Sequence, residues 1–388
     1  MLPVYLMNFF FAISTTVGMT FIPLLVTDNL GMSLFILGLI EGGSELASNI
    51  LRLITGNIFD RIRDRRMLFV TPALLAFVSK IILSFPNPWT IISSKVTERI
   101  ASGSFAAPRD AYVGENAENK GLALGFLSSA KTFGCVLGPI VVSGSTLLMG
   151  PLEENIMSII LLACFINFIG LVLSFFVDTK KKLTFSKEAI FNFGELKEVC
   201  KNLRLLFILS LFFFLGRFND GVIMLCLKKN GFPEWFYLAT ISFFNFVMLL
   251  ISPFMGYQID RKREYQILFI TVIALVVFNI FFLQLETLWW FSAILGIVCW
   301  GIQRAGAQIT FSTMIFRRTP VKFYGTTIGI YSLITGIGFF TSSIICGYLA
   351  QTSFNLAFMF SGFFSFISLL LAFYMYREDE KQLTSFIS

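Results

Sequence analysis

Several residue types that enzymes and metalloproteins depend on are missing or rare in this sequence. It contains no histidine, so any side chain that carries a proton near neutral pH has to be a carboxylate or another group. Its six cysteines are scattered, mostly within apolar runs, and form no CxxC pair. That pattern argues against a disulfide framework and against a zinc site, and buried packing is the better interpretation. No GxxxxGK[ST] phosphate loop is present.

Charged residues are also scarce, at 14% of 388 residues, whereas 56% are hydrophobic and the mean hydropathy is +0.79. A typical soluble domain has about a quarter of its residues charged. The composition therefore predicts an all-α protein that crosses the membrane many times.

Apolar runs of about 20 residues, the length that crosses the hydrocarbon layer, recur along the chain. The first has no basic start and no small-residue cleavage site, so it is interpreted as a retained span and not as a signal peptide. Twelve spans are predicted, over residues 3–27, 33–57, 66–85, 89–113, 120–149, 155–177, 204–228, 233–258, 264–283, 287–315, 322–350 and 354–376. The long polar segment 178–203 is the predicted linker between halves 1–177 and 204–388, with a surface helix near 185–199.

The net charge of +7 follows the predicted topology. With the N-terminus inside, the inner segments hold 21 of the 30 lysines and arginines, and the outer segments hold only Lys228 and Lys229. Lysine and arginine accumulate on the cytoplasmic side of membrane proteins. Both termini are therefore predicted to be cytoplasmic, and binding of nucleic acid is rejected.

One basic segment is repeated 200 residues later: GNIFDRIRDRR at 56–66 returns as GYQIDRKRE at 256–264. Two similar halves are a common construction of membrane transporters. Each aspartate lies at the C-terminal end of a span, where the negative end of the helix dipole disfavours a carboxylate. We therefore expect the carboxylate to pair with a cation or with the exposed N–H groups at the start of another helix. Such a pair would hold the inner side of the protein closed. The alternative is that these charges only fix the topology. The candidate gating residues are Gly56, Asp60, Arg61, Arg65, Gly256, Asp260 and Arg261.

Charges near the bilayer centre cost several kcal/mol, about 2.5 or more each, and need a partner, a wet cavity or a function. Lys80 and Arg52 lie near span ends and are expected to snorkel to the interface. Lys95 and eight further residues remain nearer the middle. These eight are the candidate substrate-binding or coupling residues: Glu41, Glu45, Glu98, Arg99, Lys131, Arg217, Asp220 and Arg304.

Glu41 and Glu45 are four residues apart and share one helical face. A carboxylate whose charged partner changes during a cycle can bind and release a proton. The alternative is a static network of salt bridges that joins the second, fourth and fifth spans. For Arg99 with Asp220 or Arg217 the functional interpretation is favoured, because the fourth and seventh spans are equivalent in the repeat.

The span at 120–149 carries small residues at G-x8-G-x3-GP spacing. Small residues let helix backbones approach closely, and a proline bends the helix. Plain helix packing without coupling is a strong alternative. The residues are Gly125, Gly134, Gly138 and Pro139.

Together these segments resemble the major facilitator superfamily over essentially the whole chain. The segment 56–66 resembles the family's loop 2–3 motif, although Arg63 replaces a glycine; Arg99 with Gly103 resembles the span 4 motif. The glycines of 125–139 resemble the span 5 antiporter motif, but Val142 and Ser143 replace its glycine pair.

Three shorter segments, EGGSEL, APRDAY and LGRFNDG, are similar to a group of bacterial permeases. Four residues depart from that group in the expected cavity, so no substrate is carried over: Ser102, Ser104, Phe105 and Lys131.

The resemblance implies the family's fold: twelve helices in two pseudo-symmetric six-helix bundles. These rock around a central site of spans 1, 4, 7 and 10. It further implies a monomer in a bacterial inner (plasma) membrane that moves a small solute by alternating access, driven by an ion gradient, without enzymatic chemistry, cofactor or metal.

Three functions are weighed. Proton-coupled antiport for efflux comes first, on the span 5 motif. Second is proton symport for uptake of an anionic or zwitterionic solute such as an organic acid, amino acid or siderophore-like chelate, which Arg99 and Arg217 would bind. Third is a membrane receptor that does not transport.

Overall fold

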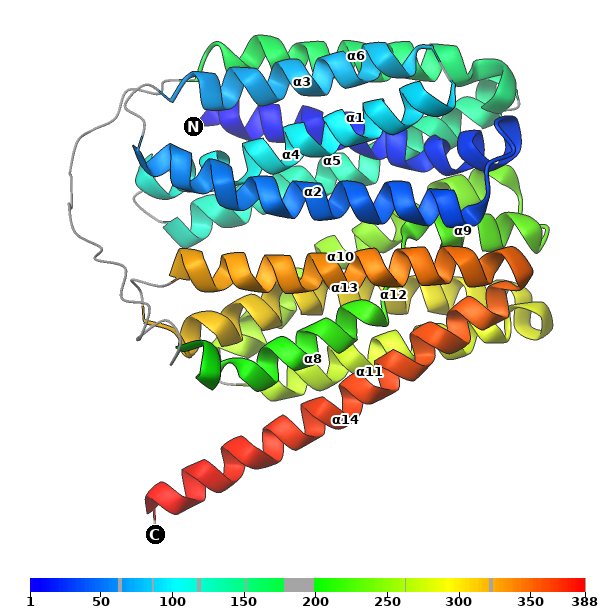
Figure 1. Cartoon of the computed structure of the whole chain (residues 1–388). Coiled ribbons are helices and arrows are strands. Elements are labelled where there is room, and N and C mark those ends of the chain that lie inside the picture. Colours follow the sequence, from blue (N-terminus) through cyan, green and yellow to red (C-terminus); the bar gives the residue numbers. More distant parts are fainter. Residues whose placement is uncertain are drawn as a thin grey trace. The chain divides into compact units, whose positions relative to one another are not determined.

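The computed structural model describes residues 1–61, 65–85, 87–116, 120–150, 152–177, 199–261, 263–320 and 324–387. Within these ranges every regular element is helical, and no strand is present (Figure 1). The predicted spans coincide with helix to within a few residues, apart from a break in the seventh and a longer last helix. The prediction of an all-α polytopic protein is confirmed.

The first half of the chain supplies the helices of the first predicted spans. The first helix continues into a π-helical turn, η1 (Leu25–Asn29). Asn87 starts α4, because its side-chain Oδ1 accepts the backbone N–H groups of Trp89 and Thr90 at 3.1 and 3.0 Å, ahead of Pro88 in the first turn. The helices are α1 (Leu2–Leu24), α2 (Leu34–Arg61), α3 (Met67–Leu83), α4 (Pro88–Asn116), α5 (Lys120–Met149) and α6 (Leu152–Ser174).

The second half follows the same order, with one interruption. The seventh predicted span is broken into α8 and α9, and α12 contains a kink at Trp289. The helices are α8 (Arg204–Leu215), α9 (Asp220–Lys229), α10 (Glu234–Asp260), α11 (Glu264–Leu283), α12 (Leu285–Arg317), α13 (Tyr324–Thr352) and α14 (Phe354–Ile387). The surface helix predicted near 185–199 lies outside the described residues, apart from its last position.

Nine helices in the described ranges are long and apolar enough to cross a membrane, with α8 and α9 taken together as Arg204–Lys229. The helix α3, at 17 residues, is shorter, and α4 carries Lys95, Glu98 and Arg99 within its length. These two helices are the ones that supply most of the buried charge described below. The charged residues within α4 lower its hydropathy, which is why it is not among the nine apolar helices.

The chain forms two compact units. Unit 1 comprises Met1–Leu183 with Asn219–Phe246, and unit 2 comprises Thr184–Phe218 with Val247–Ser388. This division by compactness differs from the predicted halves 1–177 and 204–388, because α9 and the start of α10 pack with unit 1. The predicted boundaries concern the sequence repeat, and they stay a prediction.

In unit 1, α1 packs against α5 and α6, and α4 packs against α2 and α3. The segment that joins α2 to α3 meets the end of α6: Arg66 donates to the carbonyl of Phe175 at 3.4 Å and lies 5.8 Å from its ring centroid. The start of α3 and the end of α6 are therefore at one end of this unit, where the N-terminus also lies (Figure 1).

Unit 2 shows the same arrangement of its polar connections. Arg317, at the end of α12, pairs with Glu264 at the start of α11 and donates to the carbonyl of Ile259 at 2.9 Å. Next to it, Arg318 pairs with Asp379 of α14. The segments predicted to be cytoplasmic thus meet at one end of unit 2 as well.

Candidate functional site

The second and fourth predicted spans are joined by ion pairs in unit 1. Lys95 Nζ lies 2.8 Å from Glu41 Oε1, and Arg99 Nη1 lies 2.9 Å from Glu45 Oε2. Arg99 also reaches Glu41, at 3.9 Å. Both pairs of residues have a spacing of four, so the acidic face of α2 lies against the basic face of α4. Lys95 has no exposed side-chain surface, whereas Glu45 is 33% exposed, so this set of charges runs from the interior to the surface of the unit.

A glycine allows the two helices to come this close. A Cβ built on Gly103 of α4 would lie 2.5 Å from the carbonyl oxygen of Ser48 on α2. Gly103 is one turn beyond Arg99, so the contact of the two backbones fixes the register in which the charges meet. This is a packing reason for a glycine in the span 4 motif.

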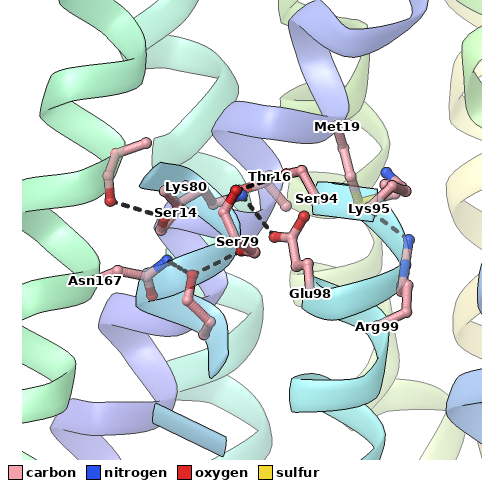
Figure 2. Close-up of polar contacts among 12 residues, drawn as sticks. Ser14, Thr16, Met19, Ser79, Lys80, Ser94, Lys95, Glu98, Arg99 and Asn167 are labelled. Carbon is pink, nitrogen blue, oxygen red and sulfur yellow. Dashed lines mark hydrogen bonds and ion pairs between the residues drawn. The ribbon is translucent and has the colours of Figure 1, made fainter. Parts of the chain in front are cut away.

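A further ion pair joins α3 to α4 behind the first set. Lys80 Nζ donates to Glu98 Oε1 at 2.8 Å, and the two side chains are 0% and 2% exposed. Figure 2 shows Glu98 directed toward Lys80, whereas Arg99 lies on another side of α4. The expectation that Lys80 snorkels to the interface is wrong. Its side chain is enclosed because a favourable partner lies within hydrogen-bonding distance inside the bundle.

Uncharged hydrogen bonds surround this buried pair. Ser94 donates to the carbonyl of Ser79 at 2.7 Å, and Asn167 of α6 donates to the carbonyl of Ala76 at 3.2 Å. Ser14 of α1 donates to α6, at the carbonyl of Ala163, at 2.9 Å (Figure 2). These hydrogen bonds join α1 to α6, α3 to α4 and α3 to α6, and within a membrane span polar groups have to be satisfied inside the protein.

The connected charges balance. Three cations and three carboxylates take part, so the fully ionised set is electrically neutral; we call it the unit 1 charge network and define it as Lys80, Lys95, Arg99, Glu41, Glu45 and Glu98. The static alternative anticipated from sequence joined the second, fourth and fifth spans. The observed network joins the second, third and fourth.

Lys131, on α5, lies outside this network. Its side chain is exposed, and none of the described residues forms an ion pair with it. Arg109 of α4 is near enough to repel it electrostatically. Arg109 itself pairs with Asp110 at 2.8 Å and donates to Asn8 of α1 at 2.7 Å. The APRDAY segment therefore connects α4 to α1, which the sequence comparison with permeases did not reveal.

The candidate residues of the seventh and tenth spans are divided between the units. Asp220, the first residue of α9, belongs to unit 1 and is near enough to attract Arg99 electrostatically. Arg217 belongs to unit 2, where its guanidinium lies 5.2 Å from the ring of Phe214 and 5.8 Å from that of Trp300. Arg304 is partly buried on α12. The functional pairing of Arg99 with Asp220 or Arg217 stays a prediction.

The candidate gating residues are only partly within the described structure. The structure describes the helical backbone at Gly56, Asp60, Arg61 and Asp260 but not what surrounds these residues. Arg65 is 2% exposed. Arg261 lies exposed after α10, with its guanidinium 4.4 Å from the ring of Tyr257, and a Cβ on Gly256 would meet no atom within 4 Å. The latching role stays a prediction.

The glycines of α5 bring this helix against α1. A Cβ on Gly134 would lie 2.6 Å from the carbonyl oxygen of Phe9, and one on Gly138 would lie 2.2 Å from Thr16 Oγ1. Pro139 follows inside α5. The surroundings of Gly125 are outside what the structure describes. At the two described glycines α5 therefore comes close to α1, and the role of the motif stays a prediction.

Comparison with known proteins decides the family. The sequence profile described as Major Facilitator Superfamily matches residues 4–307 and 234–387, which together span nearly the whole chain. The chain belongs to the major facilitator superfamily. A curated protein named as an uncharacterized MFS-type transporter from Methanocaldococcus jannaschii is 27% identical over 374 residues, covering 92% of this chain and 90% of that protein. The expected family and fold are confirmed, and the chain is an integral multi-pass membrane protein of a transporter family.

Solved structures of several transporters share this fold. A POT family transporter in complex with a thioalcohol-conjugated peptide has a TM-score of 0.78 at 16% identity, with 98% of this chain and 96% of that chain covered. A POT family transporter in complex with 5-aminolevulinic acid has a TM-score of 0.76 at 15% identity, with 98% of this chain and 96% of that chain covered. The nucleoside transporter NupG has a TM-score of 0.76 at 12% identity, with 96% of this chain and 97% of that chain covered. At these identities the likeness concerns the fold.

Proposed function

We propose that this protein is a proton-coupled secondary transporter of a small organic solute that works by alternating access. The observation that carries the proposal is the unit 1 charge network. Six ionisable side chains within the helices of a membrane protein are costly, and the set includes a carboxylate, Glu45, that is one-third exposed. Such a carboxylate can exchange protons with water while its partner Arg99 remains inside the bundle.

The sign of the solute charge would determine the direction of coupling. Arg99 is shared between Glu45 and Glu41. An anionic group that binds Arg99 competes with Glu45, and the released carboxylate then accepts a proton more readily. Solute and proton would bind together, as in symport. A cationic group that binds Glu45 would instead compete with the proton, as in antiport.

We keep proton-coupled antiport as the first candidate, on the span 5 motif, and symport of an anionic or zwitterionic solute as the second. Symport is favoured by Lys131, an exposed cation on α5 for which no described residue provides an ion pair. Arg99, Lys131, Arg217 and Arg304 are the proposed solute contacts, and Glu41, Glu45, Glu98 and Asp220 the acids that would take part in coupling.

The setting of the protein is proposed from the same pattern of charges. We place both termini on the cytoplasmic side of the plasma membrane, with the halves 1–177 and 204–388 joined by the linker 178–203, and we propose a monomer. Asp60 and Asp260 would act at the cytoplasmic ends of α2 and α10 as the latches predicted from the repeat. No cofactor, metal or nucleic acid enters this proposal.

Purified protein in liposomes tests the function. Peptides, 5-aminolevulinic acid and nucleosides, which the structural neighbours are named for, form a first panel together with organic and amino acids. We expect an imposed pH gradient to drive the movement of at least one compound, and a protonophore to abolish it. Glu45→Gln should lower gradient-driven transport by roughly tenfold. Glu154→Gln, which removes an exposed carboxylate from α6, is the matched control and should transport normally.

Two results would contradict the proposal. Transport that is unchanged when the pH gradient is collapsed would exclude proton coupling. Failure of every compound in the panel, with protein that is folded and correctly inserted, would favour a receptor that does not transport.

A further inference from the structure

The pair of Lys80 and Glu98 lies behind the candidate site and is the most buried of the ion pairs in the network, with side chains 0% and 2% exposed. Glu98 is on α4, three residues after Lys95 and one before Arg99, but it faces α3 (Figure 2). Lys80 donates to Glu98 Oε1, and no described residue donates to Glu98 Oε2. The pair is therefore adjacent to the candidate site in the chain but separated from the solvent that reaches Glu45.

The backbone of α1 makes room for this lysine. A Cβ built on Gly18 would lie 3.0 Å from Lys80 Nζ and 3.9 Å from Glu98 Oε2. The ammonium thus lies against a helix that contributes no charged side chain, because α1 contains none. Glu98 is its only described ionic partner.

Stability alone is a weak reason to keep such a pair. The cost of taking two charges out of water usually matches or exceeds their attraction, and apolar replacements of buried pairs are often neutral or stabilising. Lys80 and Glu98 do, however, act on the other charges at a distance. Glu98 interacts electrostatically with Lys95 and Arg99 as well as with Lys80. Removing either partner would leave the network with a net charge.

We propose that the Lys80–Glu98 pair is a buried counter-charge that sets the pH at which the Glu41–Lys95–Arg99–Glu45 group takes up its proton. Lys80 and Glu98 are positioning residues in this scheme, because neither needs to contact the solute. The effect of this pair on the pH dependence of transport rests on the proposed function. Its effect on the pH midpoint of the carboxylates does not, and it can be measured without any solute.

The other ionisable groups near the pair are few. The helix α1 presents Gly18 and Met19, which do not titrate, toward Lys80 and Arg99. The thiol of Cys164 on α6 interacts with Lys80, and the carboxylate of Asp220 on α9 with Arg99. On α5, Lys131 interacts with Arg109. The described charged neighbours of α4 from α2 and α3 are Glu41, Glu45 and Lys80.

The expected changes have opposite signs. Lys80→Met leaves an excess negative charge, which favours protonation, so the pH midpoint of proton uptake should rise by about one pH unit, a tenfold change in proton affinity. Glu98→Gln leaves an excess positive charge, and the midpoint should fall by about the same amount. The double variant restores neutrality and should return the midpoint close to that of the wild type.

Infrared titration of purified protein in lipid measures this directly, through the absorption of protonated carboxyl groups as a function of pH. Ser94→Ala is the matched control. It removes the bond to Ser79 between the same two helices without changing charge, so it should lower thermal stability and leave the midpoint in place. If Lys80→Met does not fold, Glu98→Gln and the double variant still provide the comparison.

The proposal is overturned if the single variants leave the midpoint unchanged or shift it in the same direction, or if the double variant fails to restore it. Transport in liposomes separates this inference from the function on which it rests. Opposite infrared shifts without any transport would reject the proposed function alone. Proton-driven transport whose pH profile is the same in all variants would reject the counter-charge alone.

Discussion

At the scale of single residues, the close contact between α1 and α5 depends on glycine, which has no Cβ atom. A Cβ added to Gly138 would lie 2.2 Å from Thr16 Oγ1 and 2.7 Å from the carbonyl oxygen of Ile13. Small residues at such positions let helices pack closely in membranes, where the hydrophobic effect does not drive helices together. Any side chain at this position has to push α1 away.

Gly138→Ala is expected to lower the free energy of unfolding by about 1 to 3 kcal/mol, the usual cost of overpacking. The measurement is thermal or denaturant unfolding of the purified protein in detergent. Gly144, on the same helix, is the matched control, because a Cβ there would meet no atom within 4 Å. Alanine at Gly144 should be neutral or slightly stabilising, since glycine weakens a helix by roughly 0.5 to 1 kcal/mol. Equal effects at both positions would contradict this explanation.

Much of the candidate site could be predicted at this scale, and the reason is helical periodicity. The spacing of four between Glu41 and Glu45 placed both on one face of α2, and the structure sets that face against Lys95 and Arg99. Lys80 was missed because its place near a span end suggested escape to the interface. Burial depends on whether a partner lies on a neighbouring helix, and one sequence does not contain that information.

At the scale of elements, the clearest departure from a regular helix is the break between α8 and α9. Asn219 has extended backbone angles, φ −71° and ψ 140°, and its side-chain Oδ1 accepts the N–H of Gly221 at the start of α9. A side-chain acceptor at this position satisfies one of the free N–H groups of the first turn. Gly221 also allows close contact with α1, since a Cβ there would lie 2.9 Å from Pro23 Cγ.

Asn219→Ala should therefore cost about 1 kcal/mol of stability through loss of the cap. Asn219→Ser retains an acceptor and should lose much less, so the pair separates capping from loss of volume. Thermal unfolding in detergent measures both variants. Equal losses would show that the cap contributes little and that Asn219 matters for its packing.

The break illustrates what an apolar run can and cannot predict. Residues 204–228 read as one span, because hydropathy averages over a window and is insensitive to a short irregular turn. Local residue types carry the missing signal, since Gly216, Asn219 and Gly221 all disfavour a helix interior. Helix positions along the rest of the chain were predictable, because a span has to satisfy its backbone hydrogen bonds internally.

At the scale of the whole molecule, the sequence repeat and the compact units describe different things. The segment Asn219–Phe246 follows the linker in sequence but packs with unit 1. Hydrogen bonds support this: Ser143 of α5 donates to the carbonyl of Trp235 at 2.8 Å, and Ser242 donates to that of Val136 at 2.5 Å. Ser143 replaces a glycine of the span 5 motif and here anchors α10. Such side-chain to backbone bonds depend on tertiary structure and leave no pattern in one sequence.

The distribution of charge predicts which ends of the helices face the cytoplasm, and two exposed lysines test it. Lys201 precedes α8 on the predicted inner side, and Lys229 ends α9 on the predicted outer side. In a background with the six cysteines replaced by serine, Lys201→Cys should react with a membrane-impermeant maleimide only in inside-out vesicles. Lys229→Cys should react only in right-side-out vesicles. Both positions are exposed, so different labelling would reflect sidedness and not burial. If both cysteines were labelled from the same side, the chain between residues 201 and 229 would not cross the membrane an odd number of times. If the pattern were reversed, the basic connections of both units would lie outside the cell.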